Sequence, residues 1–152
     1  NDETVTEMFV YEPKTSYVIA SNKGYGFVVD ENHLIAQTRQ GRKIMNVAED
    51  EYTMFCKKVT GDMIALVGEN RKILVFKMEE IPTIARGHGV CLQKYKDGGL
   101  SDMQIFNETD GFSYNRSGGV SVEKDLLTWL GHRAQVGKLA PIGFSKNNKT
   151  LK

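Results

Sequence analysis

Basic residues recur beside glycine at two corresponding places in this sequence. A shift of 47 residues places Arg39 on Arg86, so the segment 39–43 (RQGRK) corresponds to the segment 86–89 (RGHG). Glycine lets a phosphate approach closely and leaves backbone N–H groups as extra donors, while Arg and Lys supply the charge. The pattern favours phosphate binding. The residues that we expect to carry it are Lys23, Arg39, Arg42, Lys43, Arg71, Lys72 and Arg86.

Other chemistry has less support in the sequence. His88 and Cys91 have a spacing that could fit a pair of metal ligands, but no second ligand pair accompanies them. Gly24-Tyr25-Gly26 lacks the third glycine and the helical context of a dinucleotide site. We find no Walker motif and no nucleophile elbow, and we therefore predict no catalytic residue, no metal and no cofactor in this chain.

The elements that must position these bases read as short strands. The β-prone runs 17–20 and 25–29 flank a polar turn that contains Lys23, and the runs 63–67 and 73–76 repeat this hairpin 47 residues later. Further expected strands are 43–47, 52–59, 90–95, 103–106 and 112–114.

Such a repeat is typical of bladed all-β folds, in which each blade packs against the next. The alternative is that two hairpins resemble each other by coincidence. We expect repeat units at 15–61 and 62–100, a partial third unit at 101–120, and a C-terminal helix and basic tail over 121–152. Ser121 would cap that helix, with its apolar positions at Val122, Leu126, Trp129 and Leu130.

The net charge of +1 hides an uneven distribution of charge along the 152 residues. Segments 14–47 and 63–100 carry +3 and +2, and segment 121–152 carries +4, whereas segments 1–13, 48–62 and 101–120 carry −4, −2 and −2. The repeats are basic and the connections acidic. The alternative is that Lys and Arg occur at these positions only because turns are exposed to solvent.

Composition excludes several classes of protein. The apolar runs are too short to span a bilayer, and no signal peptide opens the chain. The start, Asn1-Asp2-Glu3, reads as a cut inside a larger protein. Two cysteines imply no disulfide framework, so we expect a reducing, cytoplasmic setting.

Several longer motifs resemble a known family. Gly24-Tyr25-Gly26-Phe27, the segments 36–43, 67–76, 85–90 and 92–102, and the tail 131–144 resemble blades of the C-terminal domain of bacterial type IIA topoisomerase A subunits. The sequence resembles the alphaproteobacterial form of DNA topoisomerase IV more than the related DNA gyrase. The Gln/Arg/Gly-rich box of gyrase is not present as such in this sequence. It covers roughly residues 15 to 148.

This resemblance implies a β-pinwheel fragment of about two to three blades whose basic rim binds and bends duplex DNA. In the family, this domain supports ATP-dependent strand passage, decatenation and supercoil relaxation in chromosome segregation. DNA cleavage with Mg²⁺ and ATP hydrolysis lie elsewhere in the holoenzyme. The implied partners are duplex DNA, the B subunit of topoisomerase IV and a second A subunit, the last two through the missing part, with no membrane role and a nucleoid-associated location. His88 and Cys91 stand where relatives carry bases, which puts the DNA contact there in doubt.

Two further hypotheses remain open at this point. The chain could be a protein-interaction propeller fragment with no direct DNA role, in which case its bases are merely solvated. It could also be an autonomous hydrolase or metal enzyme, which would require a metal near His88 and Cys91.

Overall fold

Two four-stranded sheets and one further hairpin make up the part of the chain that the structure describes. The computed structural model describes residues 15–41, 45–96, 98–116, 119–141 and 144. The strands are β1 (Ser16–Ser21), β2 (Tyr25–Asp30), β3 (Thr53–Lys58), β4 (Met63–Gly68), β5 (Lys72–Lys77), β6 (Val90–Cys91), β7 (Leu100–Phe106), β8 (Phe112–Arg116), β9 (Gly119–Glu123) and β10 (Lys138–Leu139), and the helical elements are α2 (Glu31–Arg39) and the 3₁₀ turn η1 (Met78–Glu80).

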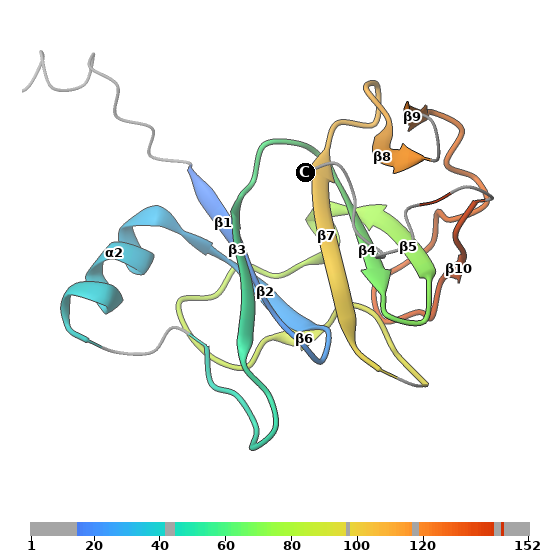
Figure 1. Ribbon diagram of the computed structural model, residues 1–152. Coiled ribbons are helices and arrows are strands. Elements are labelled where there is room, and N and C mark those ends of the chain that lie inside the picture. The colour runs from blue at the N-terminus through green and yellow to red at the C-terminus, as the bar shows by residue number, and fades with distance from the viewer. Residues whose placement is uncertain (1–14, 42–44, 97, 117–118, 142–143, 145–152) are drawn as a thin grey trace, which may run out of the picture.

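Each four-stranded sheet takes one short strand from the chain segment that follows it. Sheet 1 has the order β3-β1-β2-β6 and sheet 2 the order β10-β5-β4-β7, and all of these pairs are antiparallel. The β8–β9 hairpin forms a separate pair, which we call the third hairpin. In Figure 1, α2 lies at one end of the molecule and the third hairpin at the other, with the two sheets between them.

The 47-residue repeat is reproduced in the backbone hydrogen bonds. The amide of Val28 donates to the carbonyl of Pro82 at 2.9 Å, and the amide of Val75 donates to the carbonyl of Trp129 at the same distance. Three further backbone bonds recur in the same way. The bonds from Asn22 to Tyr52, from Glu31 to Thr15 and from Leu92 to Gly24 correspond to those from Glu69 to Gly99, from Met78 to Asp62 and from Ala140 to Arg71. In the last of these, the donor is offset by 48 residues and the acceptor by 47. Equivalent donors and acceptors at a fixed offset exclude a coincidence of two hairpins.

The apolar residues form three layers along this stack. Alternate residues of a strand face opposite sides of its sheet, so sheet 1 contributes Val18, Ala20 and Val28 to the layer that it shares with sheet 2. A second layer lies between sheet 2 and the third hairpin, around Phe112 and Tyr114. The remaining layer, on the outer face of sheet 1, consists of Ile19, Phe27, Val29 and Met45, with partly buried neighbours.

The all-β prediction is confirmed, as are the hairpins 17–29 and 63–76 and the strands near 52–59, 103–106 and 112–114. The strand predicted over 90–95 is only Val90–Cys91. The strand predicted over 43–47 is not found in its described part, residues 45–47, where Met45 makes only an isolated bridge to Gly87; residues 43 and 44 lie outside the described residues.

The predicted C-terminal helix is wrong. Residues 119–123 form β9, and the stretch that follows contains turns and the short β10. Val120 and Val122 lie in β9 and pair with Asn115 and Ser113 of β8. The apolar residues Leu126 and Trp129 instead pack in the second layer from a non-helical segment. The helix-like spacing of Val122, Leu126 and Trp129 therefore arises because strand β9 is followed directly by a non-helical segment.

The helix that does form, α2, was not predicted from the sequence. The carboxylate of Asp30 caps its start by accepting the amide of His33 at 2.9 Å, and Arg39 lies in its last turn, the end that favours a cation. None of its residues is buried. The helix therefore lacks the apolar stripe by which an amphipathic helix is recognised.

The sheets and the sequence units do not share boundaries. β6 lies within the unit 62–100 but completes sheet 1, and β7, at the start of the unit 101–120, pairs with β4 in sheet 2. The predicted unit boundaries at 61, 100 and 120 therefore stay a prediction from the sequence.

Candidate nucleic-acid interface

Lys23 lies in the β1–β2 turn and is exposed to solvent. The turn closes with a hydrogen bond from the amide of Gly24 to the carbonyl of Ser21 at 3.0 Å. Gly24 has a φ of 83°, a conformation that favours glycine. The ammonium group of Lys23 lies 4.0 Å from the carboxylate of Asp50, and both side chains are largely exposed, so the charge of Lys23 stays accessible to a ligand.

The segment 86–89 lies beside the first strand pair of sheet 1. Its glycines permit this approach, since a Cβ on Gly89 would lie 2.2 Å from the carbonyl oxygen of Gly26. The ring of His88 stacks on the ring of Tyr25, with centroids 4.4 Å apart and planes at 19°. Arg86 is exposed. Lys23 and Arg86 each precede a member of this stack by two residues, so the stack joins the two segments that carry these predicted bases.

A buried carboxylate, Glu51, connects the same two segments. It accepts the hydroxyl of Ser21, the amide of Ala48 at 2.9 Å, and Nε2 of His88 at 2.9 and 3.1 Å from its two oxygens. Burial would raise the pKa of Glu51, but the hydrogen bonds from Ala48, Ser21 and His88 outweigh it and hold the pKa below its ordinary value. Glu51 is therefore a carboxylate at neutral pH.

Arg71 and Lys72 lie at the equivalent turn of sheet 2, but the side chain of Arg71 has an internal role. Its guanidinium lies 5.6 Å from the centroid of the Phe144 ring and donates to the carbonyl of Phe144 at 3.2 Å. Lys72 is half-buried and pairs with Leu139 of β10. The side chain of Arg71 therefore holds Phe144 against sheet 2, in contrast to the exposed Lys23.

Of the remaining predicted bases, the structure describes only Arg39. Arg39 is exposed at the end of α2. Arg42 and Lys43 lie outside the described residues. The structure thus places Arg39 at the end of the molecule away from sheet 2, apart from the turn of Arg71.

Sequence reasoning missed the third member of the arginine series. Shifting Arg86 by another 47 residues reaches Arg133, and Gly41, Gly89 and Gly137 follow at steps of 48, all with positive φ. The guanidinium of Arg133 donates to the carbonyl of Cys91 at 3.0 Å, and its amide donates to Glu80 at 2.8 Å. Extending the repeat past residue 100 would have found it.

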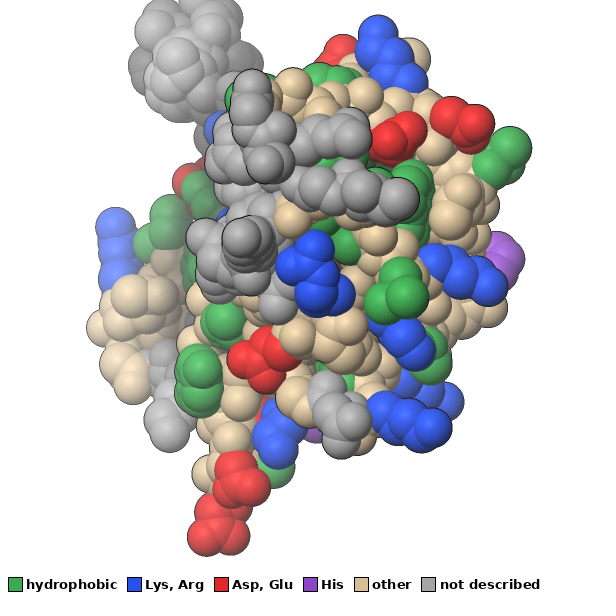
Figure 2. Space-filling model, turned by 45° about the vertical axis from the view of Figure 1, so that its right-hand side comes forward, with side chains coloured by type: hydrophobic (Ala, Val, Ile, Leu, Met, Phe, Trp, Pro, Cys, Tyr) green, Lys and Arg blue, Asp and Glu red, His purple; other side chains and the backbone are tan. Residues whose placement is uncertain are grey.

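Lys and Arg side chains gather on the face that carries β10. Figure 2, in which this side of the molecule is turned forward, shows them over its right-hand half, with Asp and Glu mostly above and below them. The exposed bases Lys94 and Lys138, which line a hollow of about 440 Å³ next to Trp129, belong to this side of sheet 2. Neither was a predicted site residue.

The residues considered as metal ligands do not form a cluster. Within the described segments, no group of three or more His, Cys, Asp or Glu side chains is placed to hold a metal ion. Burial raises the pKa of the Cys91 thiol and that of the Cys56 thiol, which disfavours the thiolate that a metal or a nucleophilic reaction requires. The same part of the chain contains no helix long and apolar enough to cross a bilayer.

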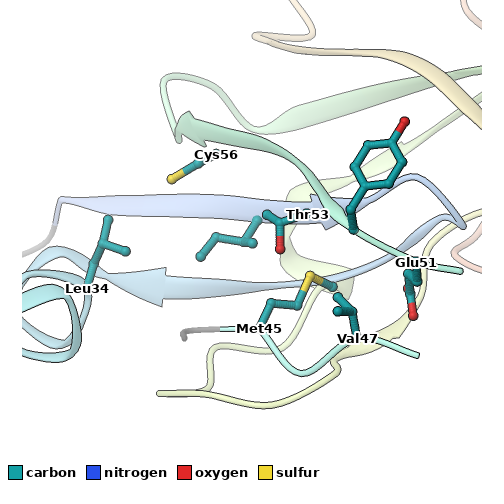
Figure 3. Close-up of a pocket in the computed structure, with 8 residues that line it drawn as sticks. Leu34, Met45, Val47, Glu51, Thr53 and Cys56 are labelled. Atoms are coloured by element: carbon teal, nitrogen blue, oxygen red, sulfur yellow. The ribbon is translucent and has the colours of Figure 1, made fainter. Parts of the chain in front are cut away.

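The outer face of sheet 1 carries an open apolar hollow of about 500 Å³. Figure 3 shows Leu34 of α2 at one end of it and Glu51 at the other, with Met45 and Val47 along one side and Thr53 and Cys56 of β3 along the opposite side. The lining is mostly apolar, so this face offers no cradle for a phosphate.

Comparison with known proteins agrees on one family. Residues 16–60 and 62–100 match the family described as the DNA gyrase C-terminal domain, β-propeller. The chain is 47% identical to the A subunit of DNA topoisomerase 4 from Rickettsia bellii and 37% identical to that from Caulobacter vibrioides, in each case over 95% of its length. It spans only 20% and 19% of these two relatives.

Solved structures support the fold. The E. coli ParC C-terminal domain superposes with a TM-score of 0.73 at 19% identity, covering 87% of this chain and 58% of that one. The DNA gyrase A C-terminal domain superposes with a TM-score of 0.64 at 11% identity, covering 91% of this chain and 47% of that one. The predicted pinwheel fragment of two to three blades is confirmed by these likenesses together with the two sheets and the third hairpin.

Proposed function

Because this chain belongs to the DNA gyrase C-terminal domain family of β-propellers, we propose that it binds and bends duplex DNA as the C-terminal part of a DNA topoisomerase IV A subunit. Binding uses the phosphates, through the exposed bases Lys23, Arg39 and Arg86, together with Arg42 and Lys43 as predicted from the sequence. Arg71 and Lys72 contribute less, because Arg71 is engaged with Phe144 and Lys72 is half-buried. Such contacts carry little sequence information, so different duplexes of equal length bind alike.

The observation that carries the proposal is the recurrence of basic loops on a repeated backbone. Lys23 and Arg86 are both exposed, each with a glycine next to it in the sequence, on segments that the Tyr25–His88 stack joins. Sheet 2 carries the exposed bases Lys94 and Lys138, so a duplex laid along the stack of sheets would meet bases of both sheets. The matching family is described as a β-propeller, whose blades are arranged in a ring. A duplex that follows such a ring must bend, at a cost of about 1–6 kcal/mol that additional contacts offset.

In the holoenzyme, this binding supports ATP-dependent strand passage, decatenation and supercoil relaxation during chromosome segregation. The chain itself supplies no catalytic group. Cleavage with Mg²⁺, together with ATP hydrolysis on the B subunit, belongs to the remainder of the assembly, which includes a second A subunit. The assembly works in the cytoplasm, at the nucleoid.

A salt titration with the 152-residue chain and a linear duplex tests DNA binding. We expect binding at low salt that weakens steeply as salt rises, because each neutralised phosphate releases counterions. The double variant Arg39→Ala with Arg86→Ala should lower affinity equally on unrelated sequences and reduce the slope of log K against log salt by about 2. No binding at low salt would contradict the proposal and favour a protein-interaction fragment, which predicts a partner held independently of salt.

Bending is tested separately by ring closure of a duplex of about 150 base pairs, a length close to the persistence length of DNA. Bound chain should accelerate ligation into circles. Tight binding with no change in the circularisation rate would retain phosphate binding and remove bending from the proposal.

A further inference from the structure

Glu51 connects three segments that are far apart in the sequence. Its carboxylate accepts from Ser21 in the β1–β2 turn, from Ala48 before β3, and from His88 in the segment 86–89. The Glu51 side chain is only 2% exposed, whereas that of His88 is 42% exposed. A buried carboxylate with three donors has its charge compensated inside the protein, so it fixes those donors relative to one another.

Two of these donors belong to the segments that carry exposed bases. The hydroxyl oxygen of Ser21 also accepts the amides of Lys23 at 3.2 Å and Tyr25 at 3.3 Å, so the turn is organised around the group that Glu51 holds. On the other side, Glu51 anchors His88, two residues after Arg86. The carboxylate therefore sets the position of the Lys23 turn relative to the Arg86 segment.

The repeat shows that the backbone fold does not require this arrangement. At the 47-residue offset, Ser21, Glu51 and His88 correspond to Gly68, Gly98 and Gln135, none of which can reproduce it. Sheet 2 fixes its own loop through Glu80, which accepts from Nδ1 of His132 at 2.9 Å and from the amide of Arg133 at 2.8 Å. The same loop is thus held by different residues in the two sheets, and in sheet 1 the carboxylate joins the two segments that carry the exposed Lys23 and Arg86.

We propose that Glu51 is a positioning residue for phosphate binding by sheet 1, acting through Ser21 and His88 on Lys23 and Arg86. This inference rests on the proposed DNA binding. The change in phosphate affinity that it predicts for removal of Glu51 is opposite in sign to the change expected from charge alone. Removing an acidic charge near bases should strengthen phosphate binding by Coulomb attraction alone. Removing a positioning residue weakens it, because the two bases no longer present a fixed pair of charges.

The experiment measures duplex affinity in a cycle of variants of the 152-residue chain. Glu51→Ala should weaken binding about threefold to tenfold and lower the salt slope by about 1, whereas in the Lys23→Ala, Arg86→Ala background it should have no further effect. Glu49→Gln, an exposed neighbour that loses the same charge, should leave affinity unchanged or slightly higher. Glu51→Gln, which keeps one carbonyl acceptor, should restore part of the loss.

A spectroscopic measurement separates positioning from general loss of structure. In Glu51→Ala, the backbone amide resonances of 22–25 and 86–89 should shift or broaden, while those of 69–72 in sheet 2 stay in place. If Glu51→Ala does not fold, His88→Ala cuts only the tie to the Arg86 segment and should give the same weakening and the same dependence on background.

The outcomes distinguish the two proposals. Wild-type chain that fails to bind duplex at low salt overturns the proposed function. Wild-type chain that binds, with Glu51→Ala and His88→Ala binding as tightly as Glu49→Gln, overturns the positioning role alone. A loss of affinity that persists unchanged in the Lys23→Ala, Arg86→Ala background also overturns it.

Discussion

Sheets 1 and 2 share one backbone scaffold but differ in what covers their faces. Sheet 2 is packed on both sides, against sheet 1 and against the third hairpin. Among the described residues, sheet 1 has a neighbouring sheet on one side only, and its other side carries the apolar layer around Ile19 and the open hollow of Figure 3. The two sheets therefore have equivalent backbone hydrogen bonds but differ in how their faces are packed.

The difference shows that the repeat specifies the backbone and leaves the side chains to set local stability and ligand contacts. The equivalent turns illustrate this division. Lys23 points its charge to solvent, whereas Arg71 uses its guanidinium to hold Phe144. Variants at equivalent positions can therefore separate what belongs to the scaffold from what belongs to each sheet.

Equivalent core residues should give the largest contrast. Leu66 is fully buried between the two sheets, and its equivalent Ile19 is 2% exposed but borders the hollow. Leu66→Ala should lower the free energy of unfolding by about 2–5 kcal/mol, and Ile19→Ala by less, because water and neighbouring groups can enter the space left. Urea denaturation of both variants provides the measurement. Equal losses would contradict the unequal packing of the two sheets.

The turn residues with positive φ should give the next largest effect. Gly24→Ala combines an unfavourable φ of 83° with a Cβ only 2.7 Å from the carbonyl oxygen of Gln93, so we expect a loss of about 1–3 kcal/mol. Arg71→Gly relieves a φ of 66° but removes the contacts with Phe144, and we expect a change within about 1 kcal/mol. Thermal unfolding monitored by circular dichroism compares them. A larger loss for Arg71→Gly would reverse the comparison.

The two carboxylates that fix the loops should give a pH-dependent contrast. The pKa of Glu51 and that of Glu80 lie below the usual value, because hydrogen bonds to each carboxylate outweigh its burial. A carboxyl whose pKa is lower in the folded than in the unfolded state stabilises the fold above about pH 4.3, and this contribution is lost as the pH falls through the folded value.

Glu51→Gln should therefore lower the free energy of unfolding by about 1–3 kcal/mol at pH 7. The difference from wild type should narrow as the pH falls from about 4.3 toward the lower folded pKa of Glu51, below which the wild-type carboxyl is also neutral. Glu80→Gln should follow the same course with a smaller amplitude, because the Glu80 side chain is 26% exposed. Urea midpoints between pH 7 and pH 3 measure both. A gap that widens toward acid would contradict the sign.

The arginine series should give the smallest effects on stability and the clearest separation of roles. Arg133→Ala removes a hydrogen bond to Cys91 and should cost about 0.5–1.5 kcal/mol. Arg86→Ala should change stability by less than about 0.5 kcal/mol and lower the salt slope of duplex binding by about 1. Unfolding and binding measured on the same preparations test the pair. Loss of stability without loss of binding in Arg86→Ala would remove that residue from the interface.

Local pattern was sufficient to predict the hairpins and the repeat. Alternating or continuous β-branched runs on both sides of Lys23 and Arg71 indicate strands joined by tight turns, and the fixed offset places Arg39 with Arg86. These features depend on residues close in sequence or on translation along it. They therefore survive without knowledge of tertiary contacts.

The features that sequence reasoning missed depend on contacts between distant segments. β9 was mistaken for part of a helix because its pairing with β8 is invisible in the spacing of Val122 and Leu126. Glu51 was overlooked because a carboxylate becomes a connecting group only once Ser21 and His88 are brought to it. The contact of Arg71 with Phe144 joins residues 73 positions apart, and no local signal reports it.

The short strands β6 and β10 make the repeats interdependent in folding. β6 pairs with β2 while the same segment continues to Leu92, which lies in the layer between the sheets. Sheet 1 therefore cannot be completed until the chain beyond sheet 2's hairpin has been ordered, and opening β6 exposes both neighbours at once. In a one-dimensional array of repeats, such overlap strengthens nearest-neighbour coupling. Unfolding of the two sheets should therefore be concerted, with a single transition in place of two separate steps.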